Sequence, residues 1–174
     1  MQKIFQNGLF IICFVVLTAT TLHAQSGKKY IDTYKELVAS LSAEYGIPAS
    51  IITAVSIIES GAGKSRNCRL LNNHFGVKGK NNLLKTKGIK SRYKQYTTNE
   101  ESFIDFCKII SRKKYYPKLK GNNDYTLWIN AIAKAGYSTT PEVWKKEINK
   151  AVRYYKLYKI DEASNTVTDK NTTE

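Results

Sequence analysis

The segment that decides the fold is "IPASIITAVSIIESGAGKS", residues 47–65. From Ala49 to Ile58 it is apolar or small nearly all the way round a helix, which predicts a helix buried on every side. Pro48 suits the first turn, where a missing N–H costs no helical hydrogen bond. Glycines at 61 and 63 predict that the helix ends in a sharp turn directly after Glu59-Ser60.

Glu59 is the only ionisable residue between Ile47 and Gly63. Burial and the negative end of the helix dipole both disfavour a carboxylate, so the pKa of Glu59 should be raised. A carboxylic acid that stays protonated near neutral pH can donate a proton to a leaving group. The competing interpretation is an ordinary glutamate at a frayed helix end, and the spacing alone favours that one.

The same stretch ends in Gly63-Lys64-Ser65, which has the letters of a phosphate-binding loop. That loop needs a glycine five residues before Gly63, where this chain has Ile58. It also enters from a strand and leaves into a helix, whereas here a helix enters and a loop leaves. We reject nucleotide binding.

The start of the chain has the layout of a secretory signal peptide. Lys3 precedes an apolar run over residues 9–17, and small residues lead to Ala24, so we expect cleavage of residues 1–24. The apolar run is short for a membrane span, and an uncleaved anchor is the alternative. We therefore expect an exported protein of the periplasm, cell envelope or extracellular space. A short linker at 25–29, a domain at 30–160 and a disordered Ser/Thr/Asn-rich tail at 161–174 should follow.

The chain carries 28 Lys and Arg against 14 Asp and Glu, a net charge of +14. So basic a protein attracts polyanions; for an exported one we expect anionic wall polymers rather than nucleic acid, with a generic solubilising charge as the alternative. Export permits a disulfide between Cys68 and Cys107, but we expect buried free thiols. No cofactor or metal is expected, because His74 stands alone after signal cleavage and no cysteine pair has ligand spacing. We also expect a monomer.

Helical spacing predicts helices over residues 30–45 and 48–60, a third from Asn99 behind a Thr98/Glu101 capping box, and two more. Of these two, one is capped by Asp124 and ends at Gly136, and the other opens at Thr139 or Thr140 before Pro141. Residues 60–97 lack helical periodicity and are rich in turn residues, so we expect loops and a small β-hairpin. The predicted class is mainly α (α+β), with a small β-lobe.

Four blocks, read in order, resemble the glucosaminidase family of peptidoglycan hydrolases, glycoside hydrolase family 73. The first is residues 47–65, with a buried helix and a Glu-Ser-Gly turn. The others are "NNHFGVKG" (72–79), "RYKQYTTNEESFIDFCKII" (92–110), which is similar to the family's strand followed by a Glu-Ser-x-x-Asp helix, and "WINAIAKAGYSTTPEVWKKEI" (128–148). Order and spacing agree over about residues 30–158.

The resemblance implies a lysozyme-like helical domain with a small β-lobe, a cleft between them, and hydrolysis of a β-1,4 bond in the peptidoglycan glycan strand. Carried over by position, Glu59 is the general acid and Tyr137 faces the scissile sugar. The substrate-binding positions are Asn73, Phe75, Gly76 and Tyr96. Core packing is the competing interpretation for Phe75 and Tyr137. His74 is expected at the cleft wall or surface.

Glycosidases usually need a second carboxylate, and the family often supplies it from the β-lobe, where this chain has none. Residues 60–99 contain no Asp or Glu. The substrate's own acetamido group can act as nucleophile; alternatively Glu100, Glu101 or Asp124 reaches the cleft, although helix capping explains them more economically. The third interpretation is that the protein binds glycan and cleaves it slowly or not at all.

The sequence thus predicts an exported endo-β-N-acetylglucosaminidase that acts on peptidoglycan. Two alternatives stay open: a muramidase or lytic transglycosylase with one glutamate on the same fold, and a non-catalytic module that binds the cell wall. A secreted nucleic-acid binder is supported by charge alone.

Overall fold

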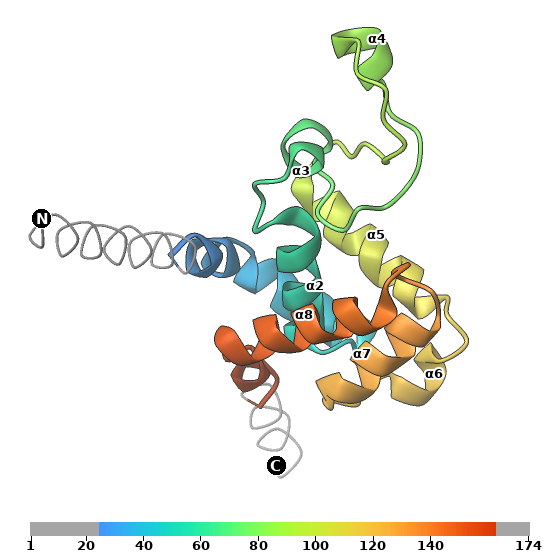
Figure 1. Ribbon diagram of the computed structural model, residues 1–174. Helices are drawn as coiled ribbons and strands as arrows, with labels where there is room; N and C mark the ends of the chain where they lie inside the picture. The colour runs from blue at the N-terminus through green and yellow to red at the C-terminus, as the bar shows by residue number, and fades with distance from the viewer. Residues whose placement is uncertain (1–24, 163–174) are drawn as a thin grey trace, which may run out of the picture.

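The predicted buried helix forms as α2, Ala49–Ser60, in the middle of the domain (Figure 1). The computed structural model describes residues 25–162. Ten of the twelve residues of α2 are buried, as an all-round apolar helix requires. α2 packs against α7, Tyr125–Lys134, and α8, Pro141–Tyr154, so two helices of the C-terminal half of the chain cover the helix that carries Glu59.

The remaining elements are also helical. Residues 25–45 form the N-terminal helix of the described chain, so residues 25–29, expected as a linker, belong to a helix instead. The predicted signal segment, 1–24, lies outside the described residues. The other helices are α3 (Arg66–Leu71), α4 (Leu83–Lys87), α5 (Asn99–Ser111) and α6 (Tyr116–Leu119), with a final helical stretch at 158–162.

Helix boundaries follow the predicted capping residues. The Glu101 N–H donates to Thr98 Oγ1 at 3.3 Å, and Glu101 Oε2 accepts from the Thr97 N–H at 2.8 Å, which closes the start of α5. Asp124 accepts from the Thr126 N–H at 2.8 Å and caps α7. Pro141 opens α8. The predicted Thr98 and Asp124 caps are confirmed, and α8 begins at Pro141 as expected, although Thr140 makes no side-chain capping bond.

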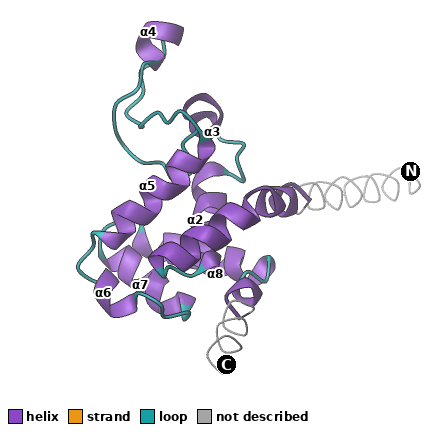
Figure 2. Cartoon of the chain, turned by 180° about the vertical axis from the view of Figure 1, so that it is seen from behind, coloured by secondary structure: helices purple, strands orange, loops and turns teal. Residues whose placement is uncertain are grey.

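Residues 66–97 form the lobe that projects beside the helical body, with α4 at its tip (Figure 1). Within the described chain its β-pairing is limited to one antiparallel bridge between Lys78 and Tyr93, where we expected a small hairpin, and Figure 2 draws helices and loops there. The prediction missed α3 and α4. Helices of five or six residues are too short to show periodicity, and local caps such as Ser65 define them.

One hydrophobic core includes α2 and the aromatic residues of α5. Phe75 stacks on Phe106 with ring centroids 4.2 Å apart and meets Phe103 edge-on, so the first residues of the lobe are anchored in the helical body. Cys68 and Cys107 are buried free thiols, as expected, and burial raises their pKa values to about 11 and about 12. No helix within residues 25–162 is long and apolar enough to cross a bilayer.

The C-terminal end of the described chain closes the start of α2. Asp161 is buried, and its Oδ1 accepts from the Ser50 N–H at 3.0 Å, which satisfies a donor in the first turn of the helix. The sequence predicts a disordered tail from residue 161, and this buried, helical Asp161 corrects that start. Residues 163–174 of that predicted tail lie outside the described residues.

Candidate active site

Glu59 lies one residue before the end of α2, and Gly61 follows in the left-handed conformation with φ +58°. The Ala62 N–H returns to the Ile57 carbonyl at 2.9 Å, so the chain turns away directly after the glutamate. Glu59 itself is half-buried. Burial raises the pKa of its carboxyl, and a hydrogen bond from Trp144 opposes that effect without cancelling it.

Trp144, on α8, is the polar partner of this carboxyl. Its indole N–H donates to Glu59 Oε1 at 3.0 Å, and its side chain is only 6% exposed. When Glu59 is protonated, Oε1, which accepts the hydrogen bond from the indole N–H, is the carbonyl oxygen. The acidic proton then lies on Oε2, which is the oxygen turned toward the lobe.

Gly76 lies on the Oε2 side of the Glu59 carboxyl. A methyl group built on Gly76 would lie 3.6 Å from Glu59 Oε2 and 3.9 Å from the Tyr93 ring, and φ is +65°. Glycine therefore keeps the surroundings of Oε2 open and adopts a backbone conformation that other residues rarely use. The Gly76 position expected from the sequence lies directly beside the predicted acid.

Tyr137 borders the acid from the turn between α7 and α8. Its ring lies 5.3 Å from the Trp144 ring, and its hydroxyl donates to the Phe75 carbonyl at 3.1 Å. Burial, and then the charge of Glu59, raise its pKa well above the ordinary value, so the hydroxyl stays neutral. The Phe75 ring lies in the core, and its carbonyl is the part of the residue that faces the site.

The other predicted binding residues hold the lobe together. Asn73 is buried, and its amide is bonded to the backbone of Val77 and Lys94. Tyr96 is 5% exposed, and its hydroxyl donates to Asp105 at 2.7 Å. Tyr96 also borders an open hollow of about 550 Å³, together with Asn72, Lys80, Asn81, Gln95 and Thr97.

His74 is buried, whereas we expected a cleft-wall or surface residue. Its ring contacts Tyr30 Oη at 2.6 Å through Nδ1 and Asn99 Oδ1 at 2.9 Å through Nε2. Burial lowers its pKa, so the ring is neutral at neutral pH. His74 is therefore a buried structural contact between the lobe, α5 and the N-terminal helix.

The three candidate carboxylates lie at helix starts, and two of them are engaged in capping. Glu101 and Asp124 are occupied as helix caps, and Glu100 is exposed at the start of α5. Among residues 25–162, no group of three His, Cys, Asp or Glu side chains is arranged to hold a metal ion. Glu59 is thus the carboxyl around which the candidate site is built.

Sequence reasoning missed two residues of the site. Trp144 lies in the fourth block, but the partner of its N–H lies 85 residues earlier in the chain. Tyr93 was not singled out, although its ring lies beside Gly76. Buried indoles usually find a hydrogen-bond acceptor, but the sequence does not show which of its two tryptophans reaches Glu59.

Comparison with known proteins matches this chain to glucosaminidases, both by a family profile and by a curated relative. A glucosaminidase family profile, described as mannosyl-glycoprotein endo-beta-N-acetylglucosaminidase, matches residues 35–157. The exo-glucosaminidase LytG of Bacillus subtilis (strain 168) is 31% identical over 153 residues, an alignment that covers 78% of this chain and 54% of LytG. The chain therefore spans about half the length of that relative.

Two solved structures share the fold. The catalytic domain of the Listeria monocytogenes autolysin Auto aligns with a TM-score of 0.63 at 22% identity and covers 78% of this chain and 88% of its own. The glycoside hydrolase domain of Salmonella typhimurium FlgJ aligns with a TM-score of 0.60 at 19% identity, and the alignment covers 84% of this chain and 98% of the FlgJ domain. These likenesses confirm the predicted lysozyme-like fold.

Proposed function

The chain belongs to the glucosaminidase family of glycoside hydrolases, and from that premise we propose that it cleaves the β-1,4 bond between N-acetylglucosamine and N-acetylmuramic acid in peptidoglycan. The proposed activity is that of an endo-β-N-acetylglucosaminidase, which the description of the family profile and the four sequence blocks support, and the proposed location is the cell envelope. The proposal depends on one observation: the half-buried Glu59 carboxyl has a raised pKa, and its Oε2 lies beside Gly76.

In the proposed reaction, Glu59 is the general acid. Its Oε2 proton passes to the glycosidic oxygen as the bond from that oxygen to the sugar C1 breaks. Trp144 supports both states of the acid, because its N–H can bond to the neutral carboxyl and more strongly to the carboxylate that remains. The carboxylate then takes a proton from the water that attacks C1, which restores the acid.

The absence of Asp and Glu from residues 60–99 favours the acetamido group of the substrate as the nucleophile. Its carbonyl oxygen would bond to C1, and water would later displace it. We propose that Tyr137 orients this group. Its hydroxyl donates to the Phe75 carbonyl, which leaves the oxygen lone pairs to accept the acetamido N–H.

We propose that the positively charged lobe attracts anionic polymers of the cell wall. Its exposed cations include Lys78, Lys80, Lys85, Lys87 and Lys90, and no acidic residue lies between residues 60 and 99. Such a surface concentrates polyanions at moderate ionic strength. We propose that the monomer reaches its substrate in this way, and that binding of the Glu59→Gln variant to sacculi weakens as salt is raised.

The direct test is lysis of purified sacculi by the wild type and by Glu59→Gln, with mass spectrometry of the fragments. The variant keeps an amide oxygen to accept a hydrogen bond from the Trp144 N–H but has no acidic proton to transfer, so lysis should slow by about 10²- to 10⁴-fold. Equal lysis by the two proteins would exclude Glu59 as the acid.

The fragments separate the alternatives on the same fold. Reducing-end N-acetylglucosamine on chains of several disaccharides is the expected product. Release of single sugars from the glycan end would establish an exo enzyme, and anhydro- or reducing-end muramic acid would establish a lytic transglycosylase or muramidase.

A further inference from the structure

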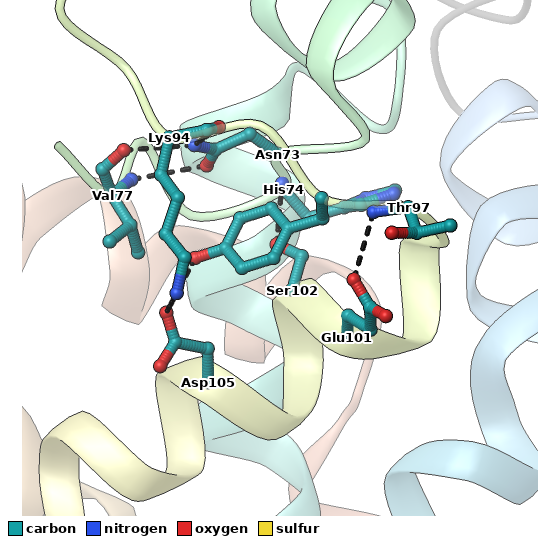
Figure 3. Close-up of polar contacts among 9 residues, drawn as sticks. Asn73, His74, Val77, Lys94, Thr97, Glu101, Ser102 and Asp105 are labelled. Carbon is teal, nitrogen blue, oxygen red and sulfur yellow. Dashed lines mark hydrogen bonds and ion pairs between the residues drawn. The ribbon is translucent and has the colours of Figure 1, made fainter. Parts of the chain in front are cut away.

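The Glu-Ser-x-x-Asp segment of α5 is not used by the chemistry proposed above, yet each of its polar residues accepts a hydrogen bond from the lobe. Glu101 Oε2 accepts from the Thr97 N–H at 2.8 Å, and Ser102 Oγ accepts from the His74 N–H at 2.9 Å. Asp105 Oδ2 accepts from both the Lys94 ammonium and the Tyr96 hydroxyl, each at 2.7 Å. Figure 3 shows these side chains rising from one helix toward the lobe.

Asp105 makes the strongest of these contacts. Its side chain is only 22% exposed, and it combines an ion pair with a second charge-assisted hydrogen bond. Burial raises the pKa of Asp105, but the bonds from Lys94 and Tyr96 and the charge of Lys94 outweigh burial and leave the pKa below its ordinary value. Asp105 is therefore ionised at neutral pH and holds both ends of the Lys94–Tyr96 segment.

Lys94 in turn fixes the segment that carries Gly76. The Asn73 amide donates to the Lys94 and Val77 carbonyls at 2.8 and 2.9 Å, and its oxygen accepts from the Val77 N–H at 3.1 Å. The Lys94 N–H also donates to the Val77 carbonyl at 2.8 Å. In Figure 3 Asn73 lies between Val77 and Lys94 and joins them.

A chain of hydrogen bonds thus runs from α5 to Val77, the neighbour of Gly76. Asp105 holds Lys94, and Lys94 and Asn73 hold Val77. Val77 follows Gly76, the residue beside Glu59 Oε2. From the other side, the Tyr137 hydroxyl holds the carbonyl of Phe75.

We propose that Asp105 is a positioning residue that holds Gly76 and Val77 at their place beside Glu59 through Lys94 and Asn73. It does not touch substrate. The proposal rests on the proposed function for its kinetic consequence, because a lobe displaced by about 1 Å can cost two orders of magnitude in rate through misplaced substrate. It also assigns a role to the polar residues of the Glu-Ser-x-x-Asp segment, which is to clamp the lobe to the helical body.

The test compares Asp105→Ala, Asp105→Asn and the control Glu142→Ala in the full chain, with soluble glycan fragments as substrate. Glu142 also pairs with a lysine, Lys145, at 2.8 Å, but it is highly exposed and far from the clamp in sequence. We expect kcat to fall about ten- to hundredfold in Asp105→Ala with a smaller change in KM. Asp105→Asn should recover part of the loss because its amide oxygen can still accept one bond, and Glu142→Ala should match the wild type.

Hydrogen exchange supplies a readout that is independent of the substrate. In Asp105→Ala the amides of Val77 and Lys94 should exchange at least tenfold faster, while amides of α2 keep their rates. If the wild type proves inactive on glycan, the proposed function fails, and the exchange rates still decide whether the clamp exists.

Two results would overturn the proposal: a kcat of Asp105→Ala within twofold of the wild type, or exchange at Val77 and Lys94 that does not change. If Asp105→Ala is unfolded at the assay temperature, folded Asp105→Asn decides instead. A kcat lowered at least threefold then supports the clamp, and an unchanged kcat excludes it.

Discussion

Replacement of Gly76 by alanine tests the geometry of the proposed acid most directly. The new methyl group would lie 3.6 Å from Glu59 Oε2, which is an ordinary contact distance, so the protein should still fold. A leaving oxygen must approach the proton-donating oxygen to about 2.6–3.2 Å. The methyl group would occupy part of the space through which that approach takes place.

Two effects of this substitution can be estimated separately. A non-glycine residue at φ +65° costs roughly 1–2 kcal/mol, which lowers the Tm of a domain of this size by roughly 3–8 °C. Obstruction of the sugar beside Oε2 should lower kcat/KM by about ten- to hundredfold, the effect expected of a displacement of about 1 Å.

Gly88 provides the matched control. It has almost the same conformation, φ +67°, but a methyl group built on it meets nothing within 4 Å. Calorimetry should therefore show similar losses of Tm for Gly76→Ala and Gly88→Ala, while release of soluble fragments from sacculi should fall only for Gly76→Ala. Equal activity of the two variants would refute the placement of Gly76 at the catalytic acid.

Three further predictions follow from the same contacts. At pH values above the folded-state pKa of Glu59, the Glu59→Gln variant should have a higher Tm than the wild type. The raised pKa means that ionisation of Glu59 destabilises the folded state as the pH rises through it. Below about pH 4, under the unfolded-state pKa, the two proteins should have the same Tm. Trp144→Phe removes a bond that lowers the pKa of Glu59, so the alkaline limb of the kcat/KM–pH profile should move to higher pH, and a limb that stays in place would argue against the contact. Asp161→Ala removes a cap of α2 and should cost about 0.5–2 kcal/mol in urea unfolding; a Glu162→Ala variant at the exposed neighbouring position should lose much less.

The sequence alone determined the elements whose signals are local. The apolar run of α2, the Thr98 and Asp124 caps and Pro141 depend on residues within one or two turns, so their effect can be read directly from the chain. The same holds for Glu59 as the lone ionisable group at the end of a buried helix. Glycine at position 76 also followed from the sequence, through the resemblance of its block.

Only the tertiary structure decided which groups meet that acid. Trp144 and Glu59 are 85 residues apart in the sequence, and Asp161 and Ser50 are 111 residues apart. Nothing local in either residue specifies such a partner, because the contact forms only when α8 and the last described residues pack on α2. Asn73, Phe75 and Tyr96 show the same limit: the sequence placed them near the site, but burial and competing hydrogen-bond partners determined that their side chains support the lobe, and these depend on the whole fold.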